Sequence, residues 1–222
     1  MTRHTILSVA CLAAMSLTAC NTTNRTLPAI RNSGEYAYEH NDVDRAFSDF
    51  KEYTEQAPGH AYGHLWLGKT YLKKDMPAHA REQFELAYTN DPENPEVIAG
   101  LCQAMYQDNH LDDLFRLLHQ RTGQKPKASD FVLLGKYSLL AGDADGAQAA
   151  LLTAAKLDKG RSIDSQLALA DFYAAIGKDE DAIKRARMAY YLNPTSPRVL
   201  AKLAELNVVA KTGIGLVPTE TE

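Results

Sequence analysis

Three prolines, Pro58, Pro92 and Pro126, stand 34 residues apart in the chain. The other landmarks of the first unit recur at the same distance in the second, so that Gly34, Ala46 and Phe50 are followed by Gly68, Ala80 and Phe84. A fixed period of 20 to 50 residues is the signature of a repeat architecture, in which each unit is one supersecondary element. The chain is therefore expected to form a row of stacked units.

The best-preserved unit is residues 61–92. It reads His64-x-x-Leu67-Gly68-x-x-Tyr71, then Ala80-x-x-x-Phe84-x-x-Ala87, then Pro92. This spacing resembles the tetratricopeptide repeat (TPR), a helix–turn–helix unit with the pattern W-x2-L-G-x2-Y, A-x3-F, P. His64 departs from it by standing where Trp is usual. The resemblance implies an all-α fold, a right-handed α-solenoid of about five TPR hairpins with a C-terminal capping helix.

The remaining units are weaker copies. In the third, Cys102 replaces the small glycine, and Leu114 and Arg121 replace the two alanines. The turn inside each hairpin gives an independent check, because all five units place there a residue type that tolerates left-handed backbone. These residues are Asn41, Asp75, Asn109, Gly142 and Gly177.

The pattern predicts a division of the whole chain. Residues 1–19 are expected to be a signal peptide, 20–27 a tether, 28–195 the TPR array, 196–211 the capping helix and 212–222 a disordered tail. The units of the array are expected at about 28–58, 61–92, 95–126, 128–160 and 162–194. Asn94-Pro95 and Ser196-Pro197 each pair an N-cap residue with a proline at the first helical position.

The N-terminus has the features of an export signal. Arg3 and His4 precede an apolar run from Ile6 to Leu17, which is too short to span a membrane. Residues 17–20, Leu-Thr-Ala-Cys, resemble the bacterial lipobox. The resemblance implies cleavage before Cys20, lipid on its sulfur, and an outer-membrane lipoprotein facing the periplasm; Asn21, which is not Asp, favours the outer over the inner membrane. An ordinary signal peptide with a chance cysteine is the alternative.

Cysteine content and charge narrow the classes of function. Three cysteines are present, and loss of Cys11 with the signal and lipidation of Cys20 would leave Cys102 as the one thiol, with no disulfide. The formal net charge of −4 is mixed along the chain. Nucleic acid is therefore not expected as a partner, because it would require a basic face.

No catalytic motif or cofactor-binding loop is recognised, so we expect neither an enzyme nor a cofactor. His60 and His64 are four residues apart, a spacing that could hold zinc, but no third ligand accompanies them. The acidic runs 112–113 and 179–181 could suggest a metal site, although they suit helix N-termini better. We therefore expect no metal.

The concave face is the candidate site. In TPR arrays the first helix of each hairpin lines an inner groove. By register these positions are Arg31, Glu35, Tyr38, Tyr62, Leu65, Lys69, Leu72, Glu96, Ala99, Gln103, Tyr106, Ser129, Val132, Lys136, Leu139, Asp164, Leu167, Asp171 and Ala174. The groove residues predicted to bind a peptide are Tyr38, Tyr62, Leu65, Lys69, Leu72, Gln103, Tyr106, Lys136 and Leu139. The alternative is that Tyr62, Leu65 and Leu72 only pack between hairpins.

Tyrosines and aliphatic side chains suit an amphipathic helix or extended peptide. A lipobox followed by about five TPRs resembles the lipoproteins of pilus and secretion systems, including type IV pilotins and the TPR lipoproteins of tight-adherence (Flp) loci. The resemblance implies a non-catalytic assembly factor whose partner is a secretin or another envelope protein. A lipoprotein adaptor that recruits cell-wall or outer-membrane assembly enzymes is the alternative.

Overall fold

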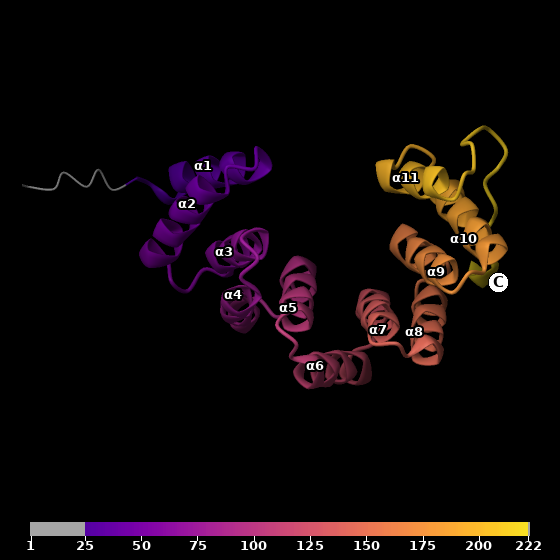
Figure 1. Cartoon of the computed structure of the whole chain (residues 1–222), viewed down its shortest axis with the longest axis horizontal. Helices are drawn as coiled ribbons and strands as arrows, with labels where there is room; N and C mark the ends of the chain where they lie inside the picture. The colour runs from indigo at the N-terminus through magenta and orange to yellow at the C-terminus, as the bar shows by residue number, and fades with distance from the viewer. Residues whose placement is uncertain (1–24, 222) are drawn as a thin grey trace, which may run out of the picture.

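The computed structural model describes residues 25–221, which form eleven α-helices and one short 3-10 helix (Figure 1). The helices are α1 (Leu27–Glu39), α2 (Val43–Gln56), α3 (Ala61–Lys73), α4 (Pro77–Asn90), α5 (Pro95–Gln107), α6 (Leu111–Gln124), α7 (Ala128–Leu140), α8 (Ala144–Leu157), α9 (Ile163–Ala175), α10 (Asp179–Leu192), α11 (Pro197–Glu205) and η1 (Thr219–Thr221). The expected signal peptide, Cys20 and residues 21–24 of the tether lie outside the described residues.

Consecutive helices form five hairpins, from α1–α2 to α9–α10, and the hairpins follow one another along a curve (Figure 1). The odd-numbered helices face the inside of the curve and the even-numbered ones its outside. The structure confirms the expected all-α solenoid. Each of the five expected units contains one hairpin.

The turns within the hairpins confirm the predicted register. The backbone φ angle is positive at Asn41 (59°), Asp75 (55°), Asn109 (57°), Gly142 (87°) and Gly177 (72°). In each case the residue follows the first helix of its hairpin, where a left-handed residue ends the helix. The weakest sequence unit, around Asn109, thus keeps the same turn as the others.

The recurring glycine explains how the two helices of a hairpin approach. A Cβ on Gly68 would lie 3.0 Å from the ring of Phe84, and one on Gly34 would lie 2.8 Å from that of Phe50. Both rings are fully buried. The glycine of the first helix therefore makes room for the aromatic ring of the second, which fills the hairpin.

The third hairpin, which has lost its small residues, is the most open. Cys102 and Leu114 are fully buried at the positions where other units have glycine and alanine. Helices α5 and α6 contact one another less than the helices of any other hairpin, and Figure 1 shows α6 crossing below α5. Larger side chains at the close-contact positions account for this separation.

The predicted helix starts have different outcomes. Asn94 Oδ1 accepts bonds from the backbone N–H of Glu96 (3.0 Å) and Val97 (3.4 Å), which confirms the N-cap. Ser196 precedes Pro197 as expected, but its side chain makes no cap bond. The acidic runs occupy the first turns of α6 and α10.

The C-terminal part differs from the expectation of a helix over 196–211 and a disordered tail. Helix α11 ends at Glu205, because Asn207 adopts a φ of 57°. It buries Val199 and Leu203, whereas Leu200 is 38% exposed.

The described part of the tail, residues 212–221, packs back on the preceding helices. The N–H of Leu216 donates to the carbonyl of Arg187 (3.1 Å), and Glu220 forms an ion pair with Arg185. Pro218 is buried. These contacts join the tail to residues of α10 some 30 positions earlier in the sequence. They hold the tail in a defined position, which its local composition alone would not predict.

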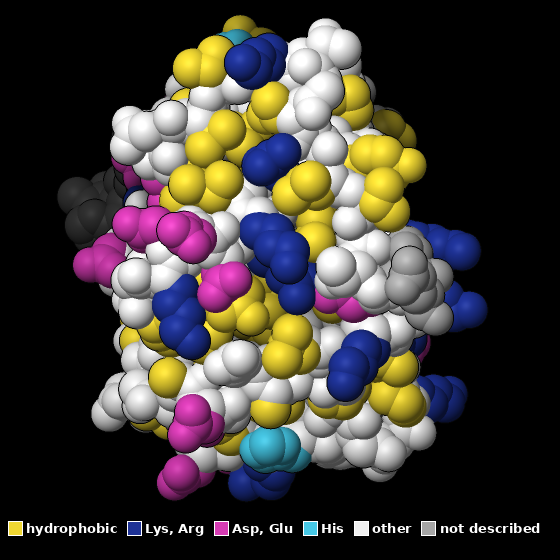
Figure 2. Space-filling model, turned by 90° about the vertical axis from the view of Figure 1, so that its right-hand side faces the viewer, with side chains coloured by type: hydrophobic (Ala, Val, Ile, Leu, Met, Phe, Trp, Pro, Cys, Tyr) yellow, Lys and Arg dark blue, Asp and Glu magenta, His cyan; other side chains and the backbone are white. Residues whose placement is uncertain are grey.

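The C-terminal end of the solenoid carries exposed apolar side chains between basic ones (Figure 2). Tyr191, Val209 and Val217 are each more than half exposed there. Within residues 25–221, none of the helices has the length and apolar character needed to cross a membrane.

Candidate functional site

The concave face contains two hollows, which we call the first and the second hollow. The first, of about 450 Å³, lies between α1, α3 and α5, and the second, of about 600 Å³, lies between α5, α7, α9 and α11. The first is lined by Tyr38, Lys69, Leu72, Lys73, Phe84, Glu96, Ala99, Gly100 and Gln103. The second is lined by Pro95, Ala99, Ser129, Val132, Leu133, Gly135, Lys136, Leu139, Leu140, Leu151, Asp164, Leu167, Ala168, Asp171, Phe172 and Arg198.

Six of the nine predicted groove residues line the hollows. Tyr38, Lys69, Leu72 and Gln103 belong to the first hollow, and Lys136 and Leu139 belong to the second. Ala99 of α5 lines both, so the two hollows lie next to one another along the concave face, on either side of this small side chain. The inner helices thus present one extended groove.

The other three predicted residues pack against neighbouring side chains outside the hollows. Leu65 is buried, with 7% of its surface exposed. Tyr62 is half-buried between Tyr53 and Trp66, and Tyr106 lies against the ring of Tyr137 at a centroid distance of 5.5 Å. The alternative interpretation, packing between hairpins, describes the position of Tyr62 and Leu65. Leu72 packs against the core and also lines the first hollow.

An aromatic cluster forms the inner wall of the first two hairpins. Trp66 meets Tyr38 edge to face at 5.2 Å and stacks on Phe50 at 5.3 Å. The hydroxyl of Tyr62 donates to Glu35 (2.7 Å), and burial together with this bond raises its pKa. This wall is a rigid support for the side chains of the first hollow.

Lysines extend from this wall into the first hollow. The ammonium of Lys69 lies 4.4 Å from the centre of the Trp66 ring and forms an ion pair with Glu96. That of Lys73 lies 3.8 Å from the Tyr38 ring and donates to the Tyr38 carbonyl (2.7 Å). Both positive charges are held by aromatic faces, which attract cations.

The second hollow has an apolar floor and a charged rim. Leu139 and Leu140 contribute apolar surface, Leu140 being half exposed, and the buried Phe172 also belongs to the lining. On the rim, Asp164 pairs with Arg198 and Asp171 with Lys202, each at 2.6 Å. Such an apolar hollow with polar edges suits side chains of a docking segment better than a free polar solute.

Sequence reasoning did not single out Lys73, Phe84 or Trp66 for the groove. Lys73 stands four residues after Lys69 and therefore on the same face of α3, a signal that could have identified it. Phe84 belongs to the outer helix α4, yet it lines the first hollow where Gly100 carries no side chain. The contact of Phe84 with Gly100 joins two hairpins and is apparent only from the three-dimensional structure.

The histidines considered for zinc have other partners. The ring nitrogens of His64 lie 2.9 Å from the side-chain oxygen of Gln83 and 2.9 Å from the carbonyl of Pro58. His60 lies near the Tyr53 hydroxyl at 3.5 Å. Over the described range, no three His, Cys, Asp or Glu residues are grouped so that they could hold a metal ion.

Comparison with known proteins identifies the repeat. Residues 32–95 match the family model described as a tetratricopeptide repeat. No curated protein sequence matches the chain closely enough to count as a relative.

Solved structures with this fold cover most of the chain. A thermophilic TPR protein from Thermus thermophilus has a TM-score of 0.65 at 19% identity, covering 83% of this chain and 100% of its own. PilW, described as a widely conserved type IV pilus biogenesis factor, has 0.58 at 16% identity, covering 80% and 83%. PilF of Pseudomonas aeruginosa has 0.56 at 18% identity, covering 81% and 82%. By its helices, its turns and these likenesses, the described chain has the α-solenoid fold of tetratricopeptide-repeat proteins, and residues 32–95 match the repeat itself.

Proposed function

We propose that this protein is a non-catalytic scaffold, held at a bacterial membrane by lipid on Cys20, which binds a segment of a partner protein in its concave groove. The observation that carries the proposal is the pair of hollows that lie side by side along the concave face and meet at Ala99. A groove with aromatic, aliphatic and charged side chains on rigid helices is the usual geometry for docking a peptide or helix.

The partner that we propose is a component of a pilus or secretion complex, such as a secretin. Two observations support this choice. PilW, a type IV pilus biogenesis factor, shares the fold over 80% of the chain. The lipobox-like residues 17–20 would place the solenoid in the same compartment as such assemblies. At 16% identity the likeness to PilW supports a shared fold, and the role in a pilus or secretion complex is our inference.

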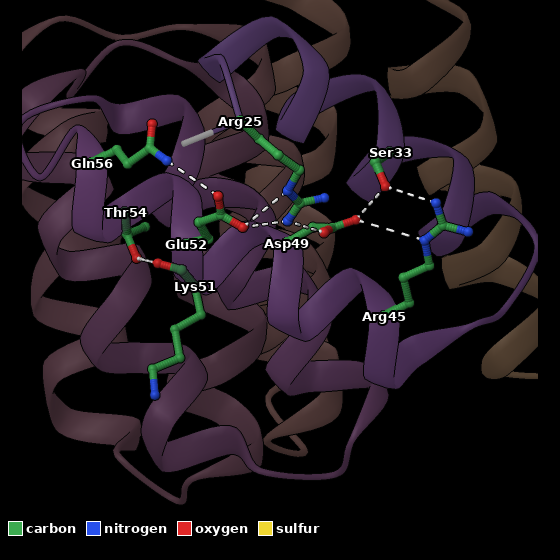
Figure 3. Close-up of polar contacts among 8 residues, drawn as sticks. All are labelled: Arg25, Ser33, Arg45, Asp49, Lys51, Glu52, Thr54 and Gln56. Atoms are coloured by element: carbon green, nitrogen blue, oxygen red, sulfur yellow. Dashed lines mark hydrogen bonds and ion pairs between the residues drawn. The ribbon is translucent and has the colours of Figure 1, made fainter. Parts of the chain in front are cut away.

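The start of the described chain suits attachment at a membrane. Arg25 donates to Asp49 (2.6 Å) and to Glu52 (3.1 Å) on α2 (Figure 3). Asp49, which is buried, also accepts from Ser33 (2.6 Å) and forms an ion pair with Arg45 (3.9 Å). This network fixes the point at which the chain leaves the solenoid.

The short distance along the chain from Arg25 to Cys20 sets how far the fold can lie from the lipid. Five residue steps reach at most about 17 Å when fully extended. A lipid on Cys20 would therefore hold the α1–α2 end close to the membrane, and the groove would extend from there into the periplasm.

Photocrosslinking in cells tests the groove. A photoreactive residue at Gln103, which is exposed in the first hollow, is expected to form adducts with envelope assembly proteins. The matched control is the same residue at Lys51, exposed on the outer helix α2. Adducts with pilus or secretin components from position 103 alone would support the proposal. Adducts with cell-wall enzymes would instead favour the adaptor role, and equal labelling from both positions would overturn docking in the groove.

A separate experiment tests the anchor. The Cys20→Ala variant is expected to move from the membrane to the soluble fraction, and the mass of the N-terminal peptide is expected to show acyl chains in the parent only. Two or more chains are needed for stable anchoring, because each buried CH2 contributes about 0.8 kcal/mol. A parent chain that is already soluble and unacylated would refute the proposed lipid anchor and would leave the proposed docking groove unaffected.

A further inference from the structure

We infer that the groove selects an acidic partner segment, with one carboxylate held at Lys73 in the first hollow, another at Lys136 in the second, and apolar side chains between them. The inference rests on the proposed docking groove and states the chemistry of what docks there. Its basis is the charge that the groove leaves uncompensated.

Each carboxylate of the concave face already has a cationic partner within the chain. The pairs are Glu35 with Arg31, Glu96 with Lys69, Asp164 with Arg198, and Asp171 with Lys202. Lys73 and Lys136 differ, since neither has a carboxylate within ion-pair distance among residues 25–221. Lys202 also pairs with Glu205 on its own helix. The groove thus presents two lysines that no carboxylate of the described chain neutralises directly, in a chain whose net charge is −4.

The ammonium group of Lys73 is positioned to bind an anion. Its ammonium donates to the Tyr38 carbonyl (2.7 Å) and lies 3.5 Å from the side-chain oxygen of Asn41. An ammonium group has three N–H donors, so one remains for a ligand. The Tyr38 ring at 3.8 Å limits the positions that the ammonium can take, which lowers the entropy lost when a carboxylate binds.

Lys136 stands at the rim of the apolar hollow. Its ammonium lies 5.2 Å from the Tyr137 ring. Leu139 on the same helix and Phe172 line the hollow beside it, and Leu140 is half exposed. A segment that covers these apolar side chains would bring its own polar residues next to Lys136.

The arrangement also sets the length of the segment. Lys73 on α3 and Lys136 on α7 lie on either side of α5, and neighbouring helix axes are about 8–10 Å apart. Because the inner helices contact one another at few residues, this is their closest spacing, and the two charges are separated by at least about 20 Å. That is the length of a helix of about 13 residues or of an extended strand of about six. The occupant is a single short segment with acidic residues flanking an apolar centre.

Selection from a random peptide library tests this chemistry without knowledge of the partner. The full chain is presented to phage that display random peptides of about 14 residues, the length estimated above for a helical segment, and the recovered peptides are sequenced. We expect the recovered peptides to be apolar and enriched in Asp and Glu. When the double variant Lys73→Glu/Lys136→Glu is presented instead of the parent, we expect the recovered peptides to be enriched in Lys and Arg. The affinity of one recovered peptide is then measured by fluorescence anisotropy.

In that measurement, Lys73→Gln and Lys136→Gln are each expected to weaken binding about threefold, the range for exposed ion pairs, and added salt is expected to reduce the difference. Lys51→Gln, on the outer face, is the matched control and should bind as the parent does. Leu139→Asp is expected to abolish binding of all peptides.

The outcomes separate this inference from the proposed function. Apolar peptides without acidic enrichment, lost in Leu139→Asp but unchanged in both lysine variants, would overturn the acidic preference and leave the docking groove standing. Peptides whose binding is unaffected by Leu139→Asp would bind elsewhere, and they would overturn both. Failure to recover any peptide would also count against both.

Discussion

The close contact between Gly100 and Phe84 gives the sharpest stability prediction. A Cβ placed on Gly100 would lie 2.3 Å from Cε1 and 2.5 Å from Cζ of the Phe84 ring, whereas carbon atoms prefer about 3.5–4.0 Å. The ring cannot simply move aside, because its opposite edge faces Gly68, where a Cβ would lie at 3.0 Å. Gly100→Ala must therefore distort α5 or the ring.

The magnitude follows from two opposing terms. Overpacking of a core costs typically about 1–3 kcal/mol. Replacing glycine by alanine inside a helix returns about 0.5–1 kcal/mol. The net loss in unfolding free energy for Gly100→Ala is therefore between about 0 and 2.5 kcal/mol. The 2.3 Å contact places it in the upper part of this range.

Two other glycines provide matched controls for the same substitution. Gly123 in α6 has nothing within 4 Å of an added Cβ, so Gly123→Ala is expected to stabilise by about 0.5–1 kcal/mol. Gly68→Ala, with its contacts at 3.0–3.1 Å, should fall between the other two.

Urea unfolding followed by far-ultraviolet circular dichroism measures the series, with midpoints compared at equal slopes. The expected order of midpoints is Gly123→Ala, parent, Gly68→Ala, Gly100→Ala. A Gly100→Ala variant as stable as Gly123→Ala would show that the ring is not confined between α3 and α5, and the packing argument would fail.

Three further predictions concern the same scaffold. Arg121→Ala should cost about 3–5 kcal/mol, because it leaves Asp130 buried and unpaired (their side chains are 8% and 3% exposed), whereas replacing both by Met and Leu should cost less; equal losses in urea melts would contradict this. Burial raises the pKa of Asp158, so the folded state binds its proton more readily. The unfolding free energy of the parent, relative to that of Asp158→Asn, should therefore be highest below about pH 4 and should fall as pH rises through the raised pKa. Parallel curves of stability against pH for the two proteins would refute this. Asn109→Val should cost about 1–2 kcal/mol at a φ of 57°, and Asn109→Gly very little, so equal melting temperatures would argue against a left-handed turn.

Much of the fold could be predicted from the sequence, because its causes are local. A left-handed turn at Asn41, Asp75 or Asn109 depends on a few neighbouring atoms, and the recurrence of suitable residues every 34 positions reveals it. Gly68, one of the two glycines that border the Phe84 ring, belongs to the same hairpin as the ring. Such features are encoded within one unit and are repeated from unit to unit.

The groove could be predicted only in part. Register places a residue on an inner helix, but it does not say whether the side chain enters the groove or the contact with the next hairpin. Leu72 and Leu65 both belong to α3, yet one lines the first hollow and the other is buried. The ordered tail, held by Glu220 on Arg185, depends on a contact between residues 35 positions apart that no local pattern records.

The buried Cys102 also offers a native chemical probe of motion. Its thiol is fully buried in the most open hairpin, and burial raises its pKa to about 12. Since the thiolate is the reactive form, alkylating reagents can modify Cys102 only when the hairpin opens. The rate of modification therefore reports how often the middle of the solenoid unfolds locally, and a bound partner that spans α5 would slow it.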